Sequence, residues 1–244
     1  MPNLLRSMAV AVVLAIAGAA SPAQATANYP YKPDEYVIIG NGLAPSKKLA
    51  IAAHGEGDLG SDNFQLWLMA EPAHKKLAAV PAIGSDNNLD SAAKAYTADW
   101  SPDSRHVAIT FRTDRHLSIT LIYTLDRGRL RELAGPSVFA FVSGLLKESA
   151  DEYDLRSGYS QIDWLGPSTF RLRDHRLYSV TSRKLVRALG RFGRQAQEPY
   201  SKEGGELRYF VEFSAEATGV VTEPGRYRLR KAKPMKFDDP NTVR

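Results

Sequence analysis

The sequence predicts an all-β protein, built as a propeller-like array of antiparallel β-meanders. Apolar residues alternate with polar or small ones along several short segments, which is the period-two pattern of half-buried strands. Turn-forming residues separate these segments at short intervals. The pattern also recurs, because Trp67 precedes Tyr123 by 56 residues and Leu77 precedes Leu133 by the same number. Meanders repeated at a fixed spacing are typical of propeller blades.

Residues 98–133 show this pattern most clearly. Ser101-Pro102-Asp103-Ser104 predicts a turn, since Pro102 presets φ and the next two side chains can hydrogen-bond the local backbone. Three strands are expected after it, separated by turns at residues 113–115 and 126–128. Their apolar positions are Val107, Ile109 and Phe111, then Ile119, Leu121, Tyr123 and Leu125, and finally Leu130 and Leu133.

This stretch resembles the TolB-type β-propeller repeat. In that family a Trp-Ser-Pro-Asp-Gly turn precedes an Ile-Ala-Phe strand, a Leu-Tyr-Val-Tyr-Asp strand and a Gly-Lys-x-x-x-Leu ending. The chain carries Trp100-Ser101-Pro102-Asp103 and departs at Ser104, where the family prefers Gly. The resemblance covers one repeat well. It implies protein–protein recognition through a propeller face, as in periplasmic binding partners of the TolB type, and it carries over no catalytic residue.

Weaker copies flank the central repeat. One covers residues 36–77, with a strand at residues 36–39 stopped by Gly40-Asn41-Gly42. The other begins at Ile162-Asp163-Trp164, repeats the Asp-Trp pair, and predicts strands at 169–172 and 176–180 before a turn that leads to Leu185 and Leu189. We therefore expect Trp100 and Trp164 to be equivalent buried residues. Residues 137–149 fit a strand or a short helix, and residues 150–159 predict an exposed loop.

The number of copies leaves the architecture open. A fourth copy would pair residues 207–213 with 226–229, but it lacks the Trp-containing turn. Propellers usually close with 4 to 8 blades. An incomplete or irregular array is therefore a serious alternative, as is a duplication within a sandwich. We predict one such domain over residues 28–236 and a flexible tail over residues 237–244.

The first 25 residues predict a signal peptide. Arg6 supplies the positive region, residues 8–20 are apolar, and Ala23-Gln24-Ala25 gives the small-x-small cleavage pattern, with Ala27 as the alternative site. A membrane span takes about 20 apolar residues, so an uncleaved anchor is the less favoured interpretation, and no transmembrane segment is expected after cleavage. The chain has no Cys, so disulfides and thiolate chemistry are excluded. These features indicate a periplasmic or secreted protein.

The sequence assigns no catalytic residue, no cofactor and no metal ligand. It contains none of the nucleophile-elbow, zincin, phosphate-loop or dinucleotide motifs. Two acidic stretches have ligand-type spacing: His54-Gly55-Glu56-Gly57-Asp58, and residues 86–90, which begin like a calcium loop. In the second, the later Gly and Glu of a calcium loop are replaced by Ser91 and Thr97, so a solvated loop is the better interpretation.

Charge is distributed unevenly along the chain. The formal net charge is +5, yet residues 28–170 sum to −4 and residues 171–236 to +9. We expect a basic face that binds an anionic partner, or else strands whose solvent faces simply carry Arg and Lys. Nucleic acid is a poor partner for an exported protein. The candidate binding residues, which alternate with apolar ones, are Arg171, Arg173, Arg226, Arg228 and Arg230.

Together these features predict an exported, non-catalytic protein-interaction module of the cell envelope. Its expected partner is an envelope protein or an anionic envelope component, and the oligomeric state stays open. The first alternative is a hydrolase or lyase on a propeller-like scaffold, with a site in the central depression. The second is a cation-dependent binding protein that uses the loops at Asp58 or Asp86.

Overall fold

The fold was examined in a computed structural model, which describes residues 26–145, 153–197, 199–201, 205, 207–222 and 225–236. The predicted signal peptide (1–25) and the predicted tail (237–244) lie outside these residues. The elements are β1 (Val37–Leu43), β2 (Leu49–Glu56), β3 (Asp62–Ala70), β4 (Lys75–Gly84), the 3₁₀ turn η1 (Ala93–Ala95), β5 (Thr97–Trp100), β6 (His106–Asp114), β7 (Leu117–Asp126), β8 (Arg129–Glu132), α1 (Val138–Leu145), β9 (Tyr153–Trp164), β10 (Thr169–Val180), α2 (Arg183–Ala188), β11 (Gly193–Gln195), β12 (Tyr209–Thr222) and β13 (Arg226–Pro234).

The prediction of an all-β chain is confirmed. Within the described residues, thirteen strands form one mixed sheet in the order β11-β12-β10-β9-β7-β6-β5-β1-β2-β3-β4, with β13 on β12 and β8 on β7. The order runs from β11 to β4 without returning to its start, so the described strands do not close into a ring. No helix in the described part of the chain is long and apolar enough to cross a membrane.

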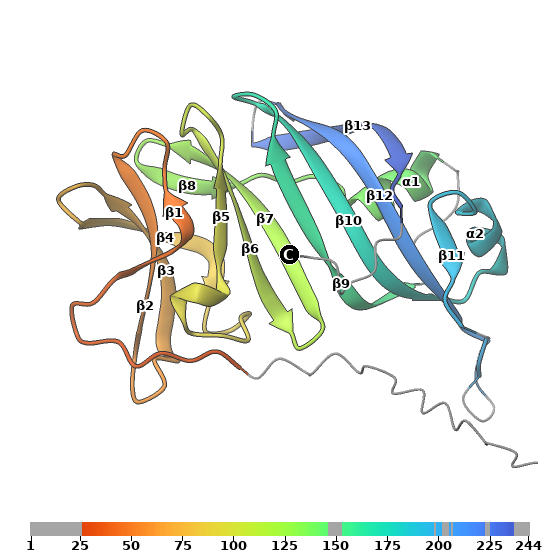
Figure 1. The fold of residues 1–244 in the computed structure, drawn as a ribbon, viewed down its shortest axis with the longest axis horizontal. Coiled ribbons are helices and arrows are strands. Elements are labelled where there is room, and N and C mark those ends of the chain that lie inside the picture. Colours follow the sequence, from red (N-terminus) through yellow and green to blue (C-terminus); the bar gives the residue numbers. More distant parts are fainter. Residues whose placement is uncertain are drawn as a thin grey trace, which may run out of the picture.

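The first eight strands form two antiparallel meanders, β1–β4 and β5–β8, on one side of the molecule (Figure 1). Their inner faces share one hydrophobic core, to which β2 contributes Ile51 and β6 contributes Val107, 56 residues later. The match shifts by one residue in the third strands. Tyr123 is buried in that core, whereas Trp67 packs on the opposite face of its own sheet. Bulges at different places in the two hairpins, β2–β3 and β6–β7, account for this shift.

The expectation that Gly40-Asn41-Gly42 ends the first strand is wrong. Strand β1 continues through these residues, and the Gly40 amide donates to the Tyr96 carbonyl beside β5. Asn41 adopts φ 54°, which produces an irregularity rather than a stop. A Cβ at Gly42 would lie 2.6 Å from the Ile51 carbonyl oxygen, so the glycine permits close approach of the two strands.

The third part of the chain differs most from the prediction (Figure 1). Residues 153–159, expected in a loop, belong to β9, and the two strands expected at 169–172 and 176–180 are one strand, β10. The polar triplet Asp174-His175-Arg176 suggested a break. Strand β10 instead buries Asp174 and Arg176 on one face, where they bond to each other. The region expected to end in a strand at Leu185 forms α2, capped by Ser182.

A second hydrophobic core lies on the inner face of β9, β10 and β12. Helix α1 covers it, with Phe139 stacked on Tyr178 at 3.8 Å and packed edge-on against Phe213 at 5.2 Å between ring centroids. Of the two alternatives for residues 137–149, the helix is therefore the one formed. Ser137 starts it by accepting a hydrogen bond from the Ala140 amide, 3.1 Å away.

Trp100 and Trp164 have equivalent roles but are half-buried rather than buried. The Trp100 indole N–H donates to the Gly42 carbonyl at 3.0 Å, and that of Trp164 donates to the Asp99 carbonyl at 2.8 Å. Each tryptophan therefore ties the strand that carries it to the first strand of the preceding unit.

Candidate functional site

The five arginines predicted to form a basic face lie on one face of the sheet. Cross-strand register aligns Arg171 with Thr218 and Thr218 with Arg230, and side chains two residues apart on a strand share a face. This outer face of β9, β10, β12 and β13 is opposite the face that carries the second core.

Acidic neighbours pair the two arginines on β10. Arg173 contacts Asp163 at 2.8 Å and Glu216 at 3.5 Å, and Arg171 lies 3.9 Å from Glu216. Glu216 also accepts a salt bridge from Lys233 at 2.9 Å. Burial acts to raise the pKa of Glu216, but the bond to Lys233 and the two guanidinium charges outweigh it and hold that pKa below its ordinary value.

The arginines on β13 have a different environment. Arg226, Arg228 and Arg230 are exposed and form no ion pair with any other described residue, whereas the alternate residue Leu229 is buried. Strand β13 pairs with β12 and lies off the main path of the sheet. The predicted face is therefore a row of unpaired cations beside a network of paired ones.

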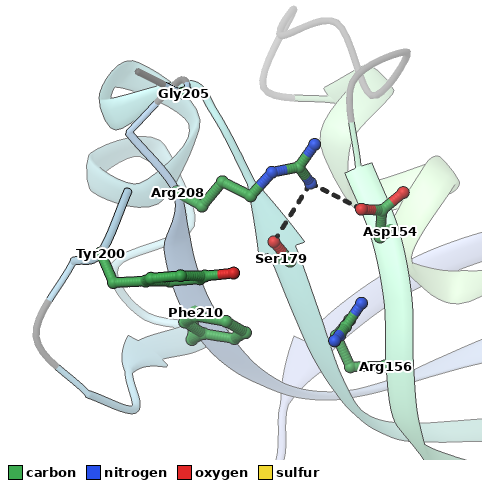
Figure 2. A pocket seen from close by; sticks show the side chains of 7 residues that line it. All are labelled: Asp154, Arg156, Ser179, Tyr200, Gly205, Arg208 and Phe210. Atoms are coloured by element: carbon green, nitrogen blue, oxygen red, sulfur yellow. Dashed lines mark hydrogen bonds and ion pairs between the residues drawn. The ribbon is translucent and has the colours of Figure 1, made fainter. Parts of the chain in front are cut away.

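A pocket of about 350 Å³ lies at the other end of the same three-stranded region (Figure 2). Ser179 of β10 and Phe210 of β12 place it on the outer face, because both alternate with residues of the inner core. The residues that line it are Asp154, Arg156, Ser179, Tyr200, Gly205, Arg208 and Phe210.

Backbone features position the two arginines of the pocket. The β9–β10 register slips between Leu177 and Tyr178, which leaves Arg156 as an extra residue on β9, and such bulges redirect side chains. Arg208 and Tyr200 exchange two backbone hydrogen bonds, Arg208 N–H to the Tyr200 carbonyl at 2.9 Å and the reverse at 3.1 Å.

The side chains of the pocket combine cations with an aromatic stack. Arg208 donates to Asp154 at 2.6 Å and to Ser179 at 3.4 Å, as Figure 2 shows. Tyr200 stacks on Phe210 with ring centroids 5.8 Å apart and an interplanar angle of 20°. Arg156 is exposed and forms no ion pair with another described residue. The pocket can therefore receive a negatively charged group attached to an apolar or aromatic body.

The sequence analysis missed every residue of this pocket. Residues 150–159 were assigned to a loop, and no local signal joins Asp154, Ser179, Tyr200 and Phe210, which come from segments that only the sheet brings together.

The two acidic stretches are occupied by structural contacts. His54 Nδ1 lies 2.7 Å from the Glu35 carbonyl oxygen, and the ring stacks on Tyr36. The Asp90 carboxylate accepts from Arg112 at 2.6 Å and 2.8 Å and from the Ala27 amide at 2.6 Å. In the described part of the chain, no three His, Asp or Glu side chains are grouped to hold a metal ion.

Comparisons with known proteins leave the site to speak for itself. No protein-family model, no curated protein sequence and no solved structure matches this chain. The function must therefore be argued from the geometry of the outer face.

Proposed function

We propose that the chain is an exported, non-catalytic interaction module of the cell envelope, which binds an acidic segment of a partner protein. The proposed binding surface is the outer face of β9, β10, β12 and β13, with the pocket at one end and the β13 arginines at the other. In this proposal the two meanders, β1–β4 and β5–β8, are TolB-like repeats in an incomplete, propeller-like array. Export rests on the signal-peptide pattern of residues 1–25.

The observation that carries the proposal is the unpaired state of Arg156, Arg226, Arg228 and Arg230 within the described residues. Arginine recognises carboxylates through two parallel N–H donors, and a guanidinium that lacks a partner keeps those donors for a ligand. The stacked rings of Tyr200 and Phe210 add an apolar surface beside Arg156. Tyr and Arg are the residue types that most often dominate the energetics of protein interfaces.

A protein segment fits this face better than a flat anionic membrane. The pocket accepts one side chain, and a bilayer surface has no such protrusion. An extended peptide can also lie along β13, which offers a strand on which backbone pairing can be extended.

The proposal is tested with a fluorescein-labelled peptide of alternating Glu and Phe residues, titrated with the chain and followed by fluorescence anisotropy. Binding should weaken steeply with salt, since the Debye length falls from about 10 Å at 0.1 M to about 3 Å at 1 M. The triple variant Arg226→Gln/Arg228→Gln/Arg230→Gln and the single variant Arg156→Gln should each weaken binding by about tenfold or more.

The matched control is Lys47→Gln/Lys48→Gln/Lys94→Gln, which removes the same charge from exposed positions of the first two meanders. Equal affinity of the two triple variants would show that only net charge matters, and the proposed face would be abandoned. A second arm uses phosphatidylglycerol vesicles. Retention on vesicles without binding of the peptide would assign the face to a membrane surface instead.

A further inference from the structure

A second cavity lies on the opposite face of the sheet, at the junction between the second meander and the third part of the chain. Its volume is about 350 Å³, within the range of small-ligand sites. It exists because the parallel strands β7 and β9 pair at only one position, Leu117 with Gly158. The strands that border it are β7, β9, β10 and β13, and the segment before α1 completes the wall.

A buried ion pair forms the polar part of this cavity. Asp174 is 2% exposed and Arg176 is 7% exposed, and the Arg176 Nε–H donates to Asp174 Oδ1. Arg176 also donates to Ser160 Oγ at 3.2 Å and lies 3.5 Å from the Ser118 carbonyl oxygen. Ser160 Oγ in turn donates to Thr120 Oγ1 at 3.0 Å, which bridges the two diverging strands.

One acceptor in this network has no donor. Asp174 Oδ2 is fully buried and has no hydrogen-bond partner among the described residues. A buried carboxylate oxygen without a donor costs free energy, so such a group in a native protein calls for an explanation. Burial raises the pKa of Asp174 above its ordinary value, although Arg176 and the nearby Phe139 amide act in the opposite direction.

The other polar side chains of the wall already have partners. Ser137 Oγ accepts from the Ala140 amide, and the Tyr227 hydroxyl donates to the Pro136 carbonyl at 3.1 Å. What the cavity offers is therefore an acceptor, Asp174 Oδ2. The exposed Glu132 adds a second carboxylate to the lining, so the two acidic groups exceed the single cation Arg176.

Apolar side chains line the rest of the cavity. Ile122, Val138 and Leu172 are at most 5% exposed and belong to the second core. A complementary ligand therefore carries a hydrogen-bond donor, preferably positively charged, on a short apolar body.

We propose that this cavity binds a small primary amine. Its ammonium group donates to Asp174 Oδ2, and its alkyl body packs against Ile122, Val138 and Leu172. This site is independent of the proposed partner-binding face, since it lies on the opposite side of β10.

The experiment compares n-butylamine with n-butanol, which have the same alkyl body and differ in charge. Isothermal titration calorimetry should show that the amine binds about tenfold or more tightly than the alcohol. In the amide NMR spectrum, butylamine should shift the signals of Ile122 and Asp174 before those of the outer face. Asp174→Asn should weaken amine binding by about tenfold or more and alter alcohol binding less than about twofold.

Glu132→Gln provides a test that does not depend on a buried substitution, because Glu132 is exposed. It should weaken amine binding a few-fold, and more at low salt. Asp126→Asn removes the same charge at the end of β7 and should leave the affinity unchanged. Equal affinity for amine and alcohol, an amine affinity insensitive to Glu132→Gln, or the absence of binding at about 10 mM amine would overturn the proposal and assign the unpaired oxygen to a buried water.

Discussion

At the scale of single residues, the buried charges of this protein are held by specific partners, and each has a definable effect. Asp90 is 1% exposed and joins three segments, because it bonds to Arg112 on β6 and to the Ala27 amide near the start of the described chain. Breaking a buried ion pair by removing one partner leaves the other charge uncompensated.

Asp90→Ala should therefore lower the free energy of unfolding by about 3–5 kcal/mol, measured by urea denaturation. Asp86→Ala is the matched control, since Asp86 belongs to the same acidic stretch but is exposed, and its effect should stay within about 0.5 kcal/mol. If the stretch instead bound calcium, Asp86→Ala would also abolish a calcium-dependent rise in the melting temperature, and that result would contradict the structural role assigned here.

His106 predicts a pH dependence of stability. Its ring stacks on Trp164, with centroids 5.6 Å apart, and Nδ1 is buried without a hydrogen-bond partner among the described residues. Burial lowers the pKa of His106 below its ordinary value of 6.5, with Arg105 acting in the same direction and Asp103 opposing it. The unfolded chain therefore takes up this proton first as the pH falls.

The contribution of His106 to stability is complete above pH 6.5 and is lost as the pH falls through the lowered pKa. His106→Phe should accordingly lose less stability than the natural chain between about pH 7.5 and about pH 5, measured as the melting temperature at each pH. Groups that titrate in both proteins cancel in this comparison. Parallel curves for the two proteins would rule out a proton uptake at His106.

At the scale of elements, close contact between strands and rings sets the demand on side-chain size. Gly219 on β12 lies under the Phe170 ring, so that an added Cβ would be 2.2 Å from it, whereas a Cβ at Gly144 in α1 would meet nothing within 4 Å. The same substitution should thus have opposite effects in the sheet and in the helix.

Gly219→Ala should lower the free energy of unfolding by about 1–3 kcal/mol, as overpacking does. Gly144→Ala should raise it by about 0.5–1 kcal/mol, because alanine is the better helix former. Urea denaturation of both variants provides the measurement. A neutral Gly219→Ala would mean that Phe170 has space to move, and that the sheet and ring are less tightly packed than described.

At the scale of the whole molecule, strands β6 and β7 connect the two cores. Val107 and Tyr123 belong to the core between the meanders, whereas Ala108 and Ile122, on the opposite face of the same strands, belong to the core under α1. Unfolding of either part would expose one face of this shared sheet to water.

The described fold should therefore unfold in one cooperative transition. Hydrogen exchange followed by mass spectrometry, at increasing urea, should give the same opening free energy for peptides from β2 and from β12. The comparison is direct because both strands are central to their own core. Two different limiting values would separate residues 28–236 into two domains.

The sequence by itself determined the strands of the two meanders, because alternation and turn chemistry are local. Val107, Ile109 and Phe111 face one core, as their spacing predicts, and the turn at Ser101 to Ser104 forms where Pro102 places it. The sequence also determined which face of each strand Arg171 and Arg228 share, since alternation decides it.

Only the tertiary structure decided what the polar residues do. Asp174 and Arg176 suggest a turn when read alone, but each supplies the partner that lets the other be buried within one long strand. The pocket around Arg156 and the cavity around Asp174 depend on a bulge and on two strands that part after a single pairing. Such features arise from contacts between distant segments, and no spacing along the chain encodes them.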